Sequence, residues 1–114
     1  IAACGGAAPS TGPATPVPAD KVFVQASNSS GAYTFTPSTL SVAAGKVTFS
    51  VRNAGGEEHE FEIFKGEKVI EEIEGIVPGL TKELTVTLEA GDYTFVCKLN
   101  GHDLAGMKGT LTVN

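Results

Sequence analysis

The sequence predicts an all-β protein, folded as an antiparallel β-sandwich of seven or eight short strands. Apolar and polar residues alternate with a period of two from about residue 20 onward, and turn-forming pairs recur between the alternating stretches. No stretch shows the 3.6-residue apolar period of an amphipathic helix. Short strands at this spacing are typical of two sheets packed around one apolar core.

Length, composition and charge restrict the class of protein. A chain of 114 residues with 41% hydrophobic residues builds one small domain, and nothing in it demands more than a monomer. The formal net charge of −5 argues against a nucleic-acid partner, because phosphate backbones require basic surfaces. No apolar stretch is long enough to span a membrane.

The N-terminal residues carry a different membrane signal. Residues 1–4 resemble the end of a bacterial lipoprotein signal peptide, in which small residues precede a cysteine that is lipidated. We therefore expect residues 1–4 to be a signal-peptide remnant and Cys4 to carry a lipid anchor to the membrane. The alternative, a disulfide between Cys4 and Cys97, is disfavoured because Cys4 opens a tail whereas Cys97 lies in a well-patterned strand.

Residues 5–19 consist of Gly, Ala, Pro, Ser and Thr with a single Val and no charge. This composition predicts a flexible linker, which when extended would hold a domain roughly 45 Å from an anchor. The folded domain is therefore expected to cover residues 20–114.

The strands are predicted from alternating apolar residues, in the order Val22, Val24 and Ala26, then Val47, Phe49 and Val51, then Leu84, Val86 and Leu88. Turn signals lie between the strands at Ala44-Gly45, Lys65-Gly66, Pro78-Gly79 and Gly91-Asp92.

Two further strands place chemically active side chains on the inner face. His59 shares a face with Phe61 and Ile63, so its ring is expected to point into the interior. The alternating residues Glu58, Glu60 and Glu62 are expected to face solvent. Cys97 shares a face with Phe95 and is expected to point inward at the end of its strand.

His59, Cys97, His102 and Met107 together predict a metal site. The chain has two histidines and one methionine, and four residues separate Cys97 from His102 and His102 from Met107. A glycine precedes both His102 and Met107, which lets a short loop curl around one point. Each residue alone is more often an ordinary surface or core residue. As a set, two imidazoles, a thiolate and a thioether favour copper over zinc, calcium or magnesium.

The segments Tyr93–Val113 and Asn53–Phe61 resemble the cupredoxins, the blue copper proteins that include plastocyanin, azurin, amicyanin and auracyanin. The resemblance implies a Greek-key sandwich over residues 20–114 that holds one copper ion, which alternates between Cu(II) and Cu(I). It makes His59, Cys97 and His102 the strong equatorial ligands and Met107 the weak axial ligand. The spacing between Cys97 and His102 is closer to azurin or auracyanin than to plastocyanin.

The chain departs from the family pattern around the ligands. Azurin has a glycine carbonyl ligand where this chain has Glu58, so coordination by four side chains is expected. Glu60 and Lys98 replace polar residues that join the two ligand strands in many cupredoxins, and we expect them to form a salt bridge. Asn53 is expected to hydrogen-bond the cysteine loop, the alternative being a strand-ending turn residue.

These ligands and the resemblance predict an electron carrier, not an enzyme, on the outer side of the cytoplasmic membrane or in the periplasm. A copper-delivery protein with the same fold is the alternative. Redox partners, such as a cytochrome or a membrane oxidoreductase, are expected to dock near an exposed edge of His102. The residues expected to supply an apolar docking patch there are Leu104, Ala105, Gly55, Gly56, Ile76 and Pro78, with ordinary core or turn roles as the alternative for Ile76 and Pro78. Glu67, Glu71, Glu72 and Glu74 form either an acidic steering surface or a solvated strand face.

Overall fold

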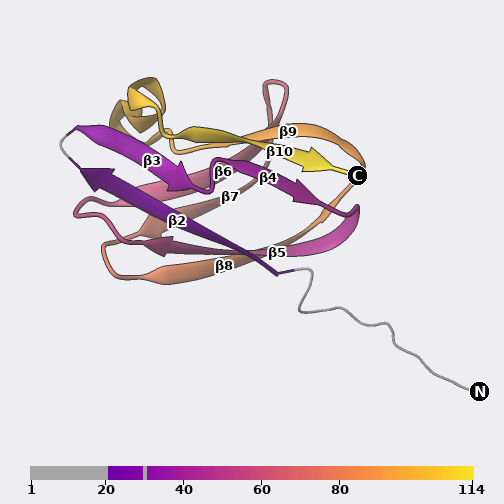
Figure 1. Cartoon of the computed structure of the whole chain (residues 1–114), viewed down its shortest axis with the longest axis horizontal. Coiled ribbons are helices and arrows are strands. Elements are labelled where there is room, and N and C mark those ends of the chain that lie inside the picture. The colour runs from indigo at the N-terminus through magenta and orange to yellow at the C-terminus, as the bar shows by residue number, and fades with distance from the viewer. Residues whose placement is uncertain (1–20, 30) are drawn as a thin grey trace, which may run out of the picture.

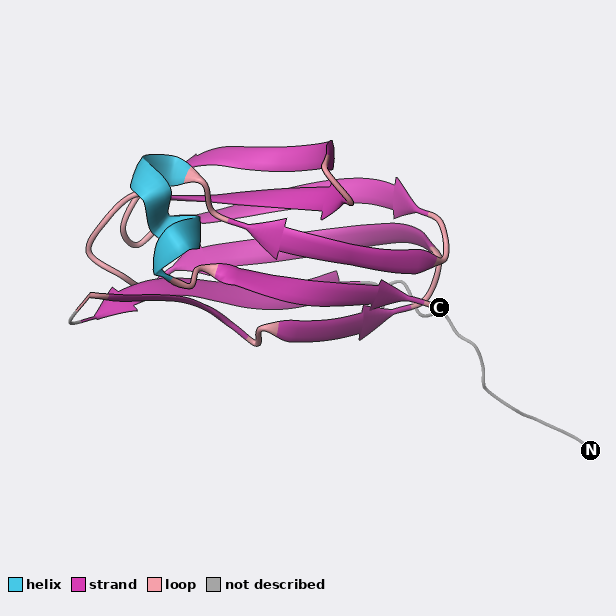
Figure 2. Cartoon of the chain, turned by 90° about the horizontal axis from the view of Figure 1, so that it is seen from above, coloured by secondary structure: helices cyan, strands magenta, loops and turns pink. Residues whose placement is uncertain are grey.

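The computed structural model of the chain describes residues 21–29 and 31–114. Cys4 and the predicted linker lie outside the described residues. Within these ranges, nine strands form two sheets that pack face to face, and one short 3₁₀ helix stands at one end of the sandwich (Figures 1 and 2). No helix among the described residues has the length and apolar character needed to cross a membrane.

The strands are bounded as follows. The four-stranded sheet contains β2 (Lys21–Ser29), β3 (Ala32–Thr36), β5 (Gly45–Asn53) and β8 (Thr81–Leu88), in the order β3-β2-β5-β8. The five-stranded sheet contains β4 (Thr39–Val42), β6 (His59–Lys65), β7 (Lys68–Ile76), β9 (Gly91–Val96) and β10 (Lys108–Val113), in the order β4-β10-β9-β6-β7. The helix η3 covers Leu99–Ala105, between β9 and β10.

The predicted β-sandwich is confirmed, with two corrections. The structure has nine described strands where seven or eight were predicted, and both sheets are mixed because β2 pairs with β5 and β4 with β10 in parallel. The prediction of antiparallel sheets came from short turns between successive strands. Both parallel pairs join strands that are not successive, so their direction depends on crossovers that local turn signals do not report.

The core lies between the sheets and is built around four phenylalanine rings. Phe61 of β6 has its ring centroid 5.6 Å from Phe35, 5.4 Å from Phe49 and 5.3 Å from Phe95. All four are at most 3% exposed, and they join both sheets. Tilted and edge-on ring pairs at this separation stabilise a core beyond the area they bury. Phe61 lies two residues after His59 on β6, so the aromatic cluster packs directly beneath the end of the sandwich that carries the His59 imidazole.

Candidate metal centre

The centre forms at one end of the sandwich, where the neighbouring strands β6 and β9 of the five-stranded sheet have their ends. β6 begins at His59 and β9 ends at Val96, one residue before Cys97. The pairing of β6 with β9 brings Glu62 opposite Val96, and this register carries His59 and Cys97 toward each other. η3 then turns back over the same end and carries His102 (Figure 1).

The structure brings His59, Cys97 and His102 together as predicted. Each offers one ligand atom, and these atoms lie within 4.8 Å of one another. Cys97 Sγ is 3.5 Å from His102 Nδ1, and the two imidazole centroids are 5.2 Å apart at an interplanar angle of 61°. All three residues are buried. Their arrangement is compatible with one copper ion.

The orientation of both imidazoles leaves Nδ1 for a metal. His59 Nε2 lies 3.1 Å from Asn28 Oδ1, and His102 Nε2 lies 3.3 Å from Glu57 Oε1. An oxygen acceptor at Nε2 fixes the proton there and presents the Nδ1 lone pair to the site. His59 Nδ1 is a buried nitrogen with no hydrogen-bond partner among the described residues. Such an orphaned acceptor facing a thiol and a second imidazole fits a soft or borderline metal ion.

Cys97 is fully buried, and two backbone N–H groups point toward its sulfur. The N–H of Glu60 donates to Sγ at 3.2 Å. Burial raises the pKa of the thiol, while the N–H groups of Glu60 and Leu99 act in the opposite direction. Burial is the largest cause that lowers the pKa of His59, and the nearby charge of His102 lowers it further. The lowered pKa keeps the His59 imidazole neutral, as a metal ligand must be.

Met107 is fully buried, and its backbone lies beside the other ligands. Cys97 N–H donates to Met107 O at 3.1 Å, and Met107 N–H donates to His102 O at 3.0 Å. Gly101 and Gly106 adopt φ of 75° and 106°, in the region where glycine is favoured. These angles give the loop the curl that the two glycines predict. The role of Met107 as axial ligand remains a prediction from the family.

The expected exposure of His102 is wrong in this structure. The residue is only 3% exposed, because Glu57 lies at its Nε2 edge and Tyr33 covers its face. The rings of Tyr33 and His102 are stacked, with centroids 4.2 Å apart and an interplanar angle of 21°. Tyr33 OH donates to Glu57 Oε2 at 2.9 Å. One carboxylate therefore holds both rings of the stack, and local sequence patterns gave no signal for either residue.

The hydrogen bond from Tyr33 to Glu57 has a measurable consequence. It is the largest cause that raises the pKa of Tyr33 above its ordinary value of 10.0, because the phenol donates its proton to a carboxylate. Glu57→Gln is expected to lower the pKa of Tyr33 toward 10.0. Ultraviolet absorbance against pH follows this ionisation, since Tyr93 is the one other tyrosine in the chain. Glu58→Gln removes an adjacent exposed carboxylate and serves as the control; equal titration curves for both variants would contradict the assignment.

Asn53 has a different role from the expected one. Its Nδ2 donates to Glu57 O at 2.6 Å and to Ile76 O at 2.7 Å, while its Oδ1 accepts from Gly55 N–H at 2.8 Å. The side chain thus fastens the loop before His59 to the end of β7, and it makes no hydrogen bond to the cysteine loop. Its position at the end of β5, where the chain turns, is the physical reason.

Asn28 fastens the same loop from the opposite side. Besides His59 Nε2, its Oδ1 accepts the N–H groups of Gly56 at 3.1 Å and Glu57 at 3.3 Å. Sequence reasoning missed this residue, which lies 31 positions before His59 in a different sheet.

The expected salt bridge between Glu60 and Lys98 is also wrong. Lys98 Nζ lies 3.9 Å from Asp103 Oδ2 and 5.1 Å from the ring centroid of Phe64. The register of β6 and β9 would place Glu60 opposite Lys98 if the ladder continued. β9 ends at Val96, however, and Lys98 adopts helical backbone angles as the N-cap of η3. The two ligand strands are instead joined by the N–H of Glu60 and the sulfur of Cys97.

Glu62 was expected to face solvent but is only 8% exposed. Burial, a hydrogen bond with Glu60 and the nearby charge of Glu72 raise the pKa of Glu62 from 4.5 to about 7, although Lys98 opposes this. An acid with a raised native pKa stays protonated in the folded state while it ionises in the unfolded chain. The ionisation of Glu62 therefore costs no stability well below pH 4.5, and it lowers the free energy of unfolding progressively as the pH rises to about 7.

Glu62→Gln is expected to remove this loss, which amounts to at most about 3 kcal/mol. Urea unfolding of the metal-free protein at pH 5 and pH 8 measures it, and the advantage of the variant should be larger at pH 8. Glu89→Gln, in the exposed turn before β9, is the control. An advantage of the same size at both pH values would contradict the explanation.

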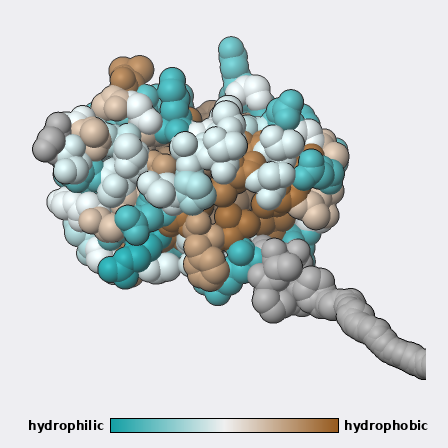
Figure 3. Space-filling model, in the orientation of Figure 1, coloured by the Kyte–Doolittle hydropathy of each residue, from teal (hydrophilic) through white to brown (hydrophobic). Residues whose placement is uncertain are grey.

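The residues predicted to form the apolar docking patch lie partly on the surface and partly in the core. Leu104 is 89% exposed, and a hydrophobic projection is visible at the η3 corner (Figure 3). Ala105, Gly56 and Pro78 are also exposed, whereas Ile76 is fully buried and belongs to the core. The acidic residues of the predicted steering surface are all exposed: Glu67, Glu71, Glu72 and Glu74.

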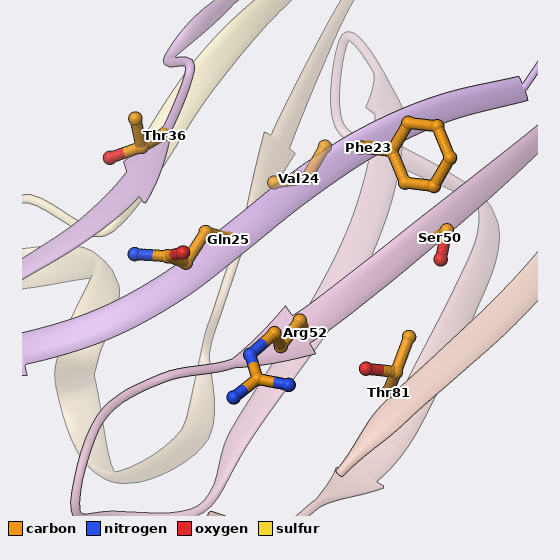
Figure 4. Close-up of a pocket in the computed structure, with 7 residues that line it drawn as sticks. All are labelled: Phe23, Val24, Gln25, Thr36, Ser50, Arg52 and Thr81. Atoms are coloured by element: carbon orange, nitrogen blue, oxygen red, sulfur yellow. The ribbon is translucent and has the colours of Figure 1, made fainter. Parts of the chain in front are cut away.

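A separate hollow lies on the outer face of the four-stranded sheet. It is lined by Phe23, Val24, Gln25, Thr36, Ser50, Arg52 and Thr81 (Figure 4). Phe23 is 68% exposed there. None of the predicted metal ligands lines this hollow, so it has no part in the metal centre.

Solved structures share this fold. An auracyanin from Roseiflexus castenholzii superposes with a TM-score of 0.72 at 21% identity, covering 83% of this chain and 97% of that chain. Auracyanin B gives a TM-score of 0.74 at 25% identity, covering 82% and 88%. Rusticyanin from Thiobacillus ferrooxidans gives 0.64 at 22% identity, covering 83% and 78%.

Sequence relatives carry a different name. The chain is 46% identical over 77 residues to the iron uptake system component EfeO of Yersinia pseudotuberculosis and 40% identical to that of Escherichia coli K12. Each match covers 68% of this chain but 20% of the relative, so the chain spans about a fifth of the length of these proteins. Residues 12–113 match the family described as Cupredoxin-like domain. With nearly the whole chain matched, a cupredoxin sandwich and a buried His-Cys-His cluster, this protein belongs to the cupredoxin-like domain family.

Proposed function

We propose that the chain is a type 1 copper protein that carries single electrons between extracytoplasmic redox partners. The observation that supports this most is the unpartnered Nδ1 of His59 beside Cys97 Sγ and His102 Nδ1. Bound copper supplies one-electron chemistry by alternating between Cu(II) and Cu(I). His59, Cys97 and His102 would hold the ion, with Met107 as the weak fourth ligand.

The surrounding residues suit a carrier because their own hydrogen bonds hold the ligands in place. Asn28 Oδ1 lies at Nε2 of His59, Glu57 Oε1 lies at Nε2 of His102, and the N–H of Glu60 points at Cys97 Sγ. Ligands fixed by two sheets and a curled loop change little between oxidation states, which keeps the reorganisation that accompanies electron transfer small. Partner docking at the η3 end of the sandwich is part of the proposal, and the exposed Leu104 supports it.

Addition of Cu(II) to the purified metal-free protein tests the proposal. We expect an intense visible thiolate-to-copper charge-transfer band at one equivalent, which bleaches on reduction and returns on reoxidation. Slow loss of copper to a chelator would agree with a carrier. A colourless protein, or rapid exchange of copper with the chelator, would favour copper storage or delivery instead.

A role in iron uptake is a second candidate. The 46% identity to an iron uptake system component favours it, although this chain matches only a fifth of that protein. Titration with Fe(II) and Fe(III), in competition with Cu(II), separates the two. Preferential binding of iron at His59, Cys97 and His102 would overturn the copper assignment, whereas copper binding with one-electron exchange to Fe(II) would join the two roles.

Attachment to a membrane by a lipid on Cys4 is a separate proposal, supported by the resemblance of residues 1–4 to a lipoprotein signal. Expression of the chain with a bacterial lipoprotein leader, followed by mass spectrometry and membrane fractionation, tests it. Cys4→Ala should release the protein from the membrane fraction without altering the copper spectrum.

A further inference from the structure

Glu57 is in contact with a metal-ligand imidazole without being a metal ligand itself. Its Oε1 lies 3.3 Å from His102 Nε2, and its Oε2 accepts the hydroxyl of Tyr33 at 2.9 Å. The side chain is 47% exposed, so it forms the boundary between the buried imidazole and solvent.

The backbone fixes where this carboxylate lies. The N–H of Glu57 donates to Asn28 Oδ1, and its carbonyl accepts from Asn53 Nδ2. Glu57 is thus held from both sides by asparagines of the four-stranded sheet, while His102 is held by η3 at the end of the other sheet. The carboxylate joins these two parts of the molecule.

We propose that Glu57 is a positioning residue for His102 and, together with Tyr33, a polar cover over the imidazole edge, so that partners exchange electrons across this cover instead of at a bare histidine. This inference rests on the proposed electron-transfer function. A carboxylate that accepts the Nε2 proton makes the imidazole a stronger donor through Nδ1, which favours Cu(II) over Cu(I). The stacked ring of Tyr33, which is only partly exposed, covers the face of the same imidazole whose edge Glu57 covers.

The first test uses metal-free protein labelled with ¹⁵N. The chain has only two histidines, so long-range proton–nitrogen spectra can assign the protonated nitrogen of each ring. In the wild type and in Glu58→Gln we expect His102 to carry its proton on Nε2, in slow exchange with water. In Glu57→Gln we expect a mixture of tautomers and faster exchange, with His59 unchanged because Asn28 holds it. Identical His102 spectra in all three proteins would overturn the proposal.

The second test compares the same proteins with copper bound. Glu57→Gln is expected to weaken Cu(II) binding by about tenfold or more, as loss of an outer hydrogen-bond partner does, with a smaller effect on Cu(I). The reduction potential should rise accordingly, and the rise should persist at high salt. Glu58→Gln removes the same charge from an exposed position, so any effect should be screened by salt. Equal potentials for the two variants at high salt would overturn the proposal.

These tests separate the two proposals. If the wild type shows no charge-transfer band with Cu(II), the proposed function fails, while the metal-free spectra still decide whether Glu57 positions His102. If the band is present but Glu57→Gln leaves both His102 and the potential unchanged, the function stands and the role of Glu57 fails.

Discussion

Cys97→Ser is expected to abolish the intense visible absorption of the copper-loaded protein. The band requires a thiolate bound to Cu(II), and a buried serine hydroxyl offers neither the soft donor nor the charge. Copper affinity should fall by more than the 10- to 100-fold that loss of an outer hydrogen-bond partner costs. Visible spectroscopy and competition with a chelator measure the two effects. Thermal unfolding of the metal-free variant checks that the fold survives.

Met107→Leu is the matched comparison for this variant. It also removes a sulfur from the buried cluster but leaves the thiolate, so the band should stay intense and shift in wavelength. An intense band in Cys97→Ser would show that Cys97 does not reach the metal.

The pH dependence of copper uptake adds an independent check. Because burial raises the pKa of the thiol, metal binding must displace its proton, and affinity should rise with pH below the thiol pKa.

The central part of the site was accessible from the sequence because it depends on short-range rules. Alternation along a strand placed His59 and Cys97 on the inner face beside Phe61 and Phe95, and all four are buried in the structure. The expected solvent exposure failed at Glu62. This residue alternates with the inward-facing Phe61 and Ile63, as predicted, but its neighbours shield it from solvent. A period of two reports which face a side chain points from, not whether other side chains cover it.

The residues around the ligands were not accessible in the same way. Asn28 reaches His59 through the pairing of β2 with β5, and Tyr33 reaches His102 through the position of η3. Neither contact leaves a local pattern in the sequence. The Glu60–Lys98 prediction came from the family pattern, and it failed because β9 ends at Val96 and Lys98 is already the N-cap of η3. Ligands thus follow from residue type and spacing, whereas the hydrogen bonds that orient them follow from tertiary structure.

Gly55→Ala is expected to disturb the metal centre without touching a ligand. A Cβ at position 55 would lie 2.8 Å from Asn28 N and would overlap with Asn28 Oδ1. Since that oxygen accepts from His59 Nε2, displacement of the Asn28 side chain leaves His59 without its orienting partner. We expect a loss of about 1–3 kcal/mol in the free energy of unfolding of the metal-free protein. Copper affinity should fall about 10- to 100-fold, measured by competition with a chelator.

Gly56→Ala separates this mechanism from a general effect on the loop. A Cβ at position 56 would meet no atom within 4 Å, so the change in the free energy of unfolding should stay within about 0.5 kcal/mol. The two glycines are adjacent and their substitutions are identical, so a difference between them isolates the contact with Asn28. Equal stability and copper affinity in both variants would mean that Asn28 does not orient His59. A large difference would show that Asn28, in β2 of the four-stranded sheet, controls the His59 imidazole on β6 of the five-stranded sheet.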